Sequence, residues 1–130
     1  MRHLQPPGWV RPRGYSNGIS ARGEMIVVAG QVGWDENEAF TDNTFPGQAA
    51  QALRNIVAVL AEAGAGPEHL VRLTWFIADK QEYLASLPRL GDAYREIIGK
   101  HYPAMSVIEV KGFIEEGAKL EIEATAVRAD

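Results

Sequence analysis

Apolar residues along this chain repeat in two ways, with the three- and four-residue spacing of a buried helical face and with the alternation of a half-buried strand. The clearest helical repeat runs from Pro46 to Ala63, with proline near the start and Gly64 just past the end. This segment is predicted to be an amphipathic helix with one buried face. The apolar positions on that face are Ala49, Ala52, Leu53, Ile56 and Leu60.

A second helical region is predicted from residue 79 to about residue 98. Asp79 is placed to cap its N-terminus, because a short carboxylate side chain accepts hydrogen bonds from the backbone N–H groups of a first helical turn. Pro88 and Gly91 lie in the middle of the region and are expected to break or kink it. Gly99 is expected to end it.

Alternating patterns predict three strands in the second half of the chain. Val71 to Ala78 is rich in aromatic and β-branched residues and is predicted to be a central strand. Two more strands are expected from Ala104 to Val110 and from Ala118 to Val127. The last of these alternates apolar with polar positions, which is typical of a sheet that helices cover on one side only. Its apolar face holds Leu120, Ile122, Ala124 and Ala126.

The first part of the chain is less regular. Residues 1–14 carry three prolines and two glycines without periodicity, so we expect an extended arm, with regular structure beginning near Tyr15. Two short strands, from Tyr15 to Ile19 and from Glu24 to Ala29, are expected to pair as a hairpin. The apolar run in the second strand predicts burial on both of its faces. Residues 31–44 are predicted to be a loop.

These elements follow one another in the order ββαβαββ, with residues 1–14 as an arm and residues 15–130 as one domain. The predicted fold class is α+β, a sheet with two helices packed on one face. A length of 130 residues suits a single domain. The other face of the sheet is left partly uncovered, and small chains usually solve that by self-association.

Composition narrows the expected partners. The formal net charge of −4 repels phosphate backbones and anionic lipid, so neither nucleic acid nor a membrane is an expected partner. Arg2, Arg11 and Arg13 gather near the N-terminus and are interpreted as part of a solvated terminus. No apolar run approaches the roughly 20 residues that span a bilayer. The absence of cysteine excludes thiolate chemistry and is compatible with a cytoplasmic location, which we expect.

Neither a metal nor a cofactor is expected. His3, His69 and His101 are the three histidines, and they show no paired spacing of the kind that metal ligands have. No glycine-rich phosphate loop follows a predicted strand and opens a helix. No serine or threonine stands in a recognisable nucleophile turn.

Four short sequences stand within or next to the predicted strands. They are Gly14-Tyr15-Ser16-Asn17, Val28-Ala29-Gly30-Gln31, Pro103-Ala104-Met105-Ser106 and Leu120-Glu121-Ile122-Glu123-Ala124. In order and spacing, together with the helix from Gln51 to Gly64, they resemble the RidA/YjgF family, also called the L-PSP endoribonuclease family. The resemblance covers roughly residues 15–127.

The resemblance implies a chorismate-mutase-like fold that assembles as a homotrimer, with sheets around the centre, helices outside and three ligand clefts between subunits. The better-known members hydrolyse reactive enamines and imines to a ketoacid and ammonia. In those members an arginine after a Pro-Ala pair holds the substrate carboxylate. A glutamate in the last strand and a tyrosine in the first strand complete the cleft. The implied partner is therefore a small metabolite, without a cofactor.

Two residues are carried over as catalytic candidates. Glu121 stands at the family glutamate, where a carboxylate can hold a water for attack on an imine carbon and pass a proton to the leaving nitrogen. The alternative is a polar residue on the solvent side of a strand. Tyr15 stands at the family tyrosine, where its hydroxyl can bond a ligand or water, or it pairs across strands. Gly30 and Gln31 match the turn whose backbone approaches the ligand, or form a plain turn.

Met105 stands where the arginine is expected. A thioether offers neither the charge nor the donors of a guanidinium, and losing that clamp is expected to cost about 2–5 kcal/mol of ligand binding. Gly91, three residues before Tyr94, replaces an asparagine that is common in the family. With Ser106 and Val107 beside Met105, these positions complete the predicted substrate-binding set. An apolar cleft favours a ligand with an uncharged or aromatic body.

The predicted function is a divergent hydrolase or deaminase of an imine, enamine or related small metabolite, rather than a 2-imino acid deaminase. A non-catalytic small-molecule-binding protein is the alternative. An endoribonuclease is disfavoured by the acidic charge and by the lack of an acid/base histidine pair. Arg13 or His101 is a candidate to compensate for the missing arginine. The alternatives are a solvated loop arginine and a histidine that caps the second helix.

Overall fold

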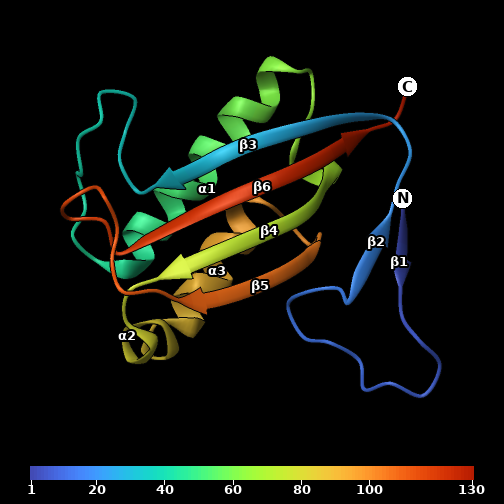
Figure 1. Cartoon of the computed structure of the whole chain (residues 1–130), viewed down its shortest axis with the longest axis horizontal. Coiled ribbons are helices and arrows are strands. Elements are labelled where there is room, and N and C mark those ends of the chain that lie inside the picture. The colour runs from blue at the N-terminus through green and yellow to red at the C-terminus, as the bar shows by residue number, and fades with distance from the viewer.

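The computed structural model describes residues 1–130, and its main sheet has four strands (Figure 1). These strands are β3 (Glu24–Val32), β4 (Leu70–Ile77), β5 (Ala104–Glu109) and β6 (Leu120–Arg128). Their order in the sheet is β3-β6-β4-β5. β6 pairs antiparallel with both of its neighbours, whereas β4 and β5 run parallel. β4 is thus an inner strand, which confirms the prediction of a central strand in this part of the chain.

The helices lie on one face of the sheet, behind it in the view of Figure 1. They are α1 (Phe45–Glu62), the 3-10 turn η1 (Pro67–His69), α2 (Lys80–Ala85) and α3 (Leu87–Ile97). The predicted α+β class is confirmed. The break expected near Pro88 falls at Ser86, and Asp79 caps α2 by accepting hydrogen bonds from the N–H groups of Gln81 and Glu82. No helix is both long and apolar enough to cross a bilayer.

The centre of the core is the contact between α1 and β6. Burying a leucine or isoleucine side chain completely contributes about 1.5–3 kcal/mol, so this contact is a main source of stability. The alternation predicted for the last strand is confirmed, because its apolar positions are buried while Glu123 is exposed. Residues with no measurable exposure here are Ala49, Ala52, Ile56 and Leu60 of α1 and Leu120, Ile122 and Ala126 of β6.

One polar side chain, Gln48 of α1, is 1% exposed and uses its amide fully. Its Nε2 donates to the backbone carbonyls of Gly117 at 2.8 Å and Asp42 at 3.2 Å, and its Oε1 accepts from the N–H of Lys119 at 2.8 Å. Gln48 therefore joins the loop before α1 to the loop before β6. A buried amide is tolerated when its donors and acceptors are all satisfied in this way.

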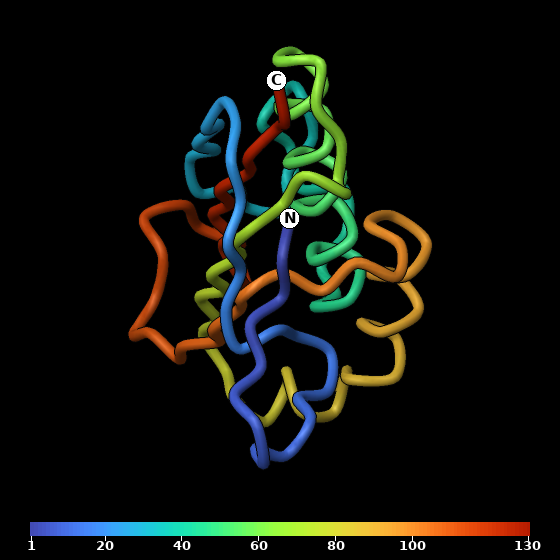
Figure 2. The backbone as a smooth tube through the Cα atoms, turned by 90° about the vertical axis from the view of Figure 1, so that its right-hand side faces the viewer, coloured from blue at the N-terminus to red at the C-terminus, as the bar shows by residue number.

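The N-terminal region differs from the sequence prediction. Strand β1 (Arg2–Leu4) pairs antiparallel with β2 (Gly18–Ser20), so regular structure begins well before Tyr15. β2 pairs with β1 and not with β3, and the predicted hairpin between the first two strands is therefore wrong. Figures 1 and 2 show this small sheet beside the main one, next to the start of β5.

The physical reason for the wrong hairpin lies at Gly23, just before β3. Gly23 has a φ of 143°, and a Cβ there would collide with the backbone carbonyl oxygen of Arg128. The backbone just before β3 therefore packs directly against the end of β6, the strand with which β3 pairs. β2 instead forms its backbone hydrogen bonds with β1. The side-chain amide of Asn17 also donates to the side-chain oxygen of Gln5 across the loop at 2.8 Å.

The predicted burial of both faces of β3 is also wrong. Met25 is 67% exposed and Val27 is 69% exposed, whereas Val28 is 2% exposed. No helix covers the face to which Met25 and Val27 point, so the apolar run of β3 is buried on one side only in the single chain. Ile108 of β5, 46% exposed, lies on the same open face because its partner Phe76 faces away from the helices.

Replacing Gln48 by leucine tests the role of its buried amide. Gln48→Leu leaves the N–H of Lys119 and the carbonyl of Gly117 without a partner, and the expected loss is about 2–3 kcal/mol of unfolding free energy. Urea denaturation of the variant measures this loss. Gln81→Leu, at an exposed position, is the matched control and is expected to stay within about 0.5 kcal/mol of the parent. Equal stability of the two variants would contradict the assignment.

Candidate functional site

Glu121 and Gly30 lie against each other where β3 pairs with β6. The register of that pairing shifts between Val28 and Gln31, so β3 bulges around Gly30. A Cβ on Gly30 would collide with Oε2 of Glu121, which means that the carboxylate occupies space that only glycine leaves open. The half-buried carboxylate of Glu121 thus rests on the bulged backbone, on the face of the sheet without helices.

Gln31 is part of the same strand and not of the predicted loop, because β3 continues to Val32. It pairs with Ile122, and its side-chain Nε2 donates to the carbonyl of Ala29 at 3.0 Å. This hydrogen bond spans Gly30, so the side chain of Gln31 holds the bulged backbone from its C-terminal side. Gly30, Gln31 and Glu121 are brought together by this part of the fold.

Tyr15 lies at the other end of the sheet, in the loop that joins β1 to β2. It is 42% exposed. Its neighbour Ser16 is tied to the start of β5, because its N–H donates to the carbonyl of Pro103 at 3.0 Å and its Oγ donates to the carbonyl of Tyr102 at 2.5 Å. Tyr15 is therefore held next to the first residue of β5, Ala104, with which Ser16 forms an isolated bridge.

Met105 faces the helices. It pairs with Leu73, which is fully buried, and it packs against the hydrophobic core as a partly buried residue. Val107 lies on the same face of β5, whereas Ser106 pairs with Thr74 on the face without helices. The three predicted substrate-binding residues of β5 are thus divided between the two faces of the sheet.

Gly91 lies in α3, on the helical layer. A Cβ added there would stand 3.3 Å from Nη1 of Arg95, whose guanidinium is held by Asp92 at 2.8 Å. A cation therefore stands beside the position at which the resemblance places an asparagine. Arg95 was not among the predicted site residues, although its spacing of four from Gly91 within a predicted helix could have identified it.

Met105 and Glu121 do not meet within one chain. Leu73 is opposite Met105 and Phe76 is opposite Glu121, so two strand spacings and three residues separate the pair. With strands about 4.8 Å apart and a rise of about 3.3 Å per residue, their Cα atoms are about 14 Å apart. Their side chains also point to opposite faces of the sheet. One chain therefore holds the predicted site residues in two separate places.

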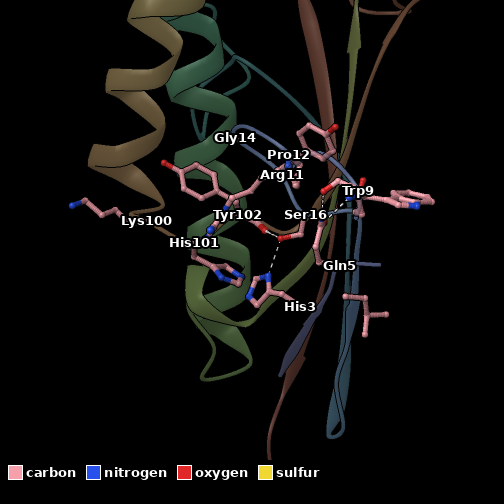
Figure 3. Close-up of a pocket in the computed structure, with 13 residues that line it drawn as sticks. His3, Gln5, Trp9, Arg11, Pro12, Gly14, Ser16, Lys100, His101 and Tyr102 are labelled. Carbon is pink, nitrogen blue, oxygen red and sulfur yellow. Dashed lines mark hydrogen bonds between the residues drawn. The ribbon is translucent and has the colours of Figure 1, made fainter. Parts of the chain in front are cut away.

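A pocket of about 850 Å³ lies between the N-terminal loop and residues 100–102 (Figure 3). Tyr15 and Ser16 form part of its wall, and His3 and His101 meet inside it with ring centroids 5.8 Å apart. The sequence predicted no histidine pair, and no local signal could have found one, because these two residues lie far apart in the sequence. Arg11 lines this pocket, and Arg13 is not among the lining residues.

His101 does not cap the second helical region, which corrects one alternative from the sequence. Its Nε2 lies 2.7 Å from the carbonyl oxygen of Leu70, at the start of β4. The backbone carbonyl of His101 accepts a hydrogen bond from the hydroxyl of Tyr94 at 2.6 Å, and the ring of Tyr94 stacks on Tyr102. Burial, with a smaller contribution from Tyr102, raises the pKa of Tyr94 above its usual range, so this hydroxyl remains a donor at neutral pH.

No group of three or more histidine, cysteine, aspartate or glutamate side chains is arranged to hold a metal ion. The groups available to bind a ligand or a water are carboxylate, hydroxyl, imidazole and backbone groups. Glu121 can hold a water at the bulge of β3, and the pocket at the other end of the sheet can hold a small ligand.

Comparisons with known proteins match nearly the whole chain to one family. The family model described as Endoribonuclease L-PSP matches residues 10–128. The 2-iminobutanoate/2-iminopropanoate deaminase of Salmonella typhimurium is 30% identical over 114 residues, which cover 88% of this chain and 87% of that protein.

Two solved structures extend the comparison to the fold. YyfB from Yersinia pestis, a protein of unknown function of the conserved Rid family, superposes with a TM-score of 0.86 at 29% identity, covering 98% of each chain. Escherichia coli TdcF, solved with bound serine, superposes with a TM-score of 0.69 at 26% identity, covering 99% of this chain and 100% of TdcF. The chain belongs to the RidA/YjgF family, the family also described as endoribonuclease L-PSP.

Proposed function

We propose that this protein is a homotrimeric hydrolase of an imine, an enamine or a related small metabolite, with its clefts between subunits. The observation that carries the proposal is the carboxylate of Glu121 seated on the bulge at Gly30, in a chain of the RidA/YjgF family. The reaction is R₂C=NH + H₂O → R₂C=O + NH₃. We place the reaction in the cytoplasm, as the absence of cysteine favours.

The separation of Met105 from Glu121 supports a shared cleft. One chain holds these residues on opposite faces of its sheet, so a small ligand can touch both only if they come from different subunits. The open face of the sheet offers apolar surface for such an assembly, with Met25 and Val27 each about two-thirds exposed. Self-association over this face would cover that surface.

The chemistry assigned to Glu121 is the handling of water and protons. The carboxylate accepts a hydrogen bond from a water, which attacks the imine carbon and forms a C–O bond. One proton of this water passes through the carboxylate to the nitrogen, which gives a carbinolamine. The proton of the new hydroxyl then follows the same route, so that the C=O bond forms as the C–N bond breaks and ammonia leaves. Tyr15 is proposed to bond the ligand or the water from the other side of the cleft.

The identity of residue 105 decides the substrate class. Met105 has no positive charge, so a substrate carboxylate gains no charge-assisted pair at this position. Met105 and Val107 share one face of β5 and are both apolar, which favours a ligand with an uncharged or aromatic body. We therefore propose a substrate other than a simple 2-imino acid.

A second candidate is a non-catalytic protein that binds a small apolar metabolite in the same clefts. The observation in its favour is again Met105, which removes the clamp that fixes a reacting carboxylate. This candidate predicts that a ligand raises the melting temperature without product release. His3 and His101 meet, so the lack of a histidine pair does not count against an endoribonuclease. The net charge of −4 still disfavours a polynucleotide.

Restoring the arginine tests the substrate assignment. Met105→Arg is expected to raise kcat/KM for 2-iminobutanoate by about 30-fold or more, because a bidentate clamp on a carboxylate is worth at least about 2 kcal/mol. Ammonia release from the imine generated in situ measures this rate. Met105→Leu is the size-matched control and should leave the rate unchanged. A parent protein as fast as the arginine variant would contradict the proposed role of Met105.

Removing the charge of Glu121 tests the catalytic assignment. In the Met105→Arg background, Glu121→Gln is expected to lower kcat by about 100-fold or more, since an amide neither accepts nor returns the proton. Glu123→Gln is the matched control, because Glu123 lies on the same face of β6 but not against Gly30. It is expected to stay within about twofold of the background. Unchanged ammonia release in Glu121→Gln would refute the mechanism.

A charge on the open face tests the assembly. Multi-angle light scattering of the parent should give three times the chain mass of 14.2 kDa. Val27→Glu is expected to shift the protein to the monomer, because a buried unpaired carboxylate costs several kcal/mol. Val10→Glu carries the same change at a position that is 91% exposed and outside the main sheet, and it should leave the mass unchanged. A monomeric parent would overturn the shared cleft.

A further inference from the structure

The pocket between the N-terminal loop and residues 100–102 is basic. Among its 13 lining residues are His3, Arg11, Lys100 and His101, and there is no aspartate or glutamate. The chain as a whole carries a net charge of −4, so this concentration of cationic groups runs against the overall balance. A concave site with cationic walls and no acid is suited to a negatively charged ligand.

The two histidines are held so that each directs one ring nitrogen into a protein hydrogen bond. Ser16 Oγ donates to the carbonyl of Tyr102, and it therefore accepts from Nδ1–H of His3, 2.8 Å away. Nε2 of His101 faces the carbonyl of Leu70 at 2.7 Å and must donate its proton to it. These two bonds define the tautomer of each ring.

The second nitrogen of each ring makes no hydrogen bond within the chain. A proton added there gives the ring a positive charge and a new donor without breaking the bond that holds it. The rings lie almost perpendicular, at 80°, with centroids 5.8 Å apart (Figure 3). Two imidazolium groups so close repel each other, and an anion between or beside them relieves that repulsion.

We propose that this pocket binds a small anion, through a carboxylate or phosphate group that contacts His3, His101 and Arg11. Arg11 supplies a permanent charge and a planar fork of donors, and each histidine has one ring nitrogen without a partner in the chain. Lys100 extends away from the two rings and contributes only at longer range (Figure 3). The site goes beyond the proposed hydrolysis, because it shares Tyr15 with the hydrolytic cleft but is lined by neither Met105 nor Glu121.

The anion site adjoins the cleft residue Tyr15, which belongs to the same pocket wall. The hydrogen bonds of Ser16 tie this wall to the start of β5. A ligand bound by the basic groups would therefore fix the loop that carries Tyr15. The ionisable side chains that face the pocket are His3, Arg11, Tyr15, Lys100, His101 and Tyr102.

The test uses the full chain and two probes whose charge is constant between about pH 6 and pH 8. Sulfate stands for a phosphate group, and acetate stands for a carboxylate. Each is titrated while the Cε1–H signals of the three histidines are followed by NMR. The signals of His3 and His101 are expected to shift together with one dissociation constant, and His69, outside the pocket, serves as an internal control.

Matched variants distinguish binding of the anion in the pocket from general electrostatic attraction to the N-terminal loop. Arg11→Gln is expected to weaken binding about tenfold, and Arg13→Gln, which removes the same charge from the same loop outside the pocket, should change it less than about twofold. Tighter sulfate assigns the site to a phosphate group, and tighter acetate assigns it to a carboxylate.

Three outcomes would overturn the proposal. These are unshifted signals of His3 and His101, equal weakening by both arginine variants, or a shift of His69 as large as those of the other two histidines. Because none of these measurements depends on ammonia release, failure of the anion site is distinguishable from failure of the hydrolase.

Discussion

The burial of one face of β6 against α1 is the contact on which the rest of the structure depends. Leu120, Ile122 and Ala126 are fully buried on that face, and the alternation of a strand then places Glu121 and Glu123 on the other. Because β3 and β4 pair with β6 in a fixed register, the burial of β6 also decides which of their side chains face the helices. A slip of one residue would bury the glutamates and expose the core.

That one-sided packing explains why the candidate site residues lie in separate places. Glu121 is held on the open face by the bulge at Gly30, while Met105 is turned toward the helices by its pairing with Leu73. The apolar side chains of Met25 and Val27 remain uncovered on the open face, opposite Val127 and Thr125 of β6. A helix layer on one face therefore leaves the other face available both for assembly and for a carboxylate near water.

The N-terminal segment adds a second kind of surface. β1 and the loop after it bring His3 and Arg11 to residues 100–102, and the hydroxyl of Tyr94 anchors that segment to α3. The resulting pocket is cationic in a chain with an acidic overall charge. Tyr15 lines this pocket and also lies next to the start of β5, so the pocket and the start of β5 share one wall.

The sequence by itself determined whatever depends on neighbouring residues: the helix with its periodic apolar face, the cap at Asp79, the alternation of the last strand and the family resemblance. Only the tertiary structure decided which strands pair, that β2 joins β1 rather than β3, and that His3 meets His101. The reason is physical. Periodicity and capping act over a few residues, whereas pairing and pocket formation join segments that nothing local connects and that only the shared core brings together.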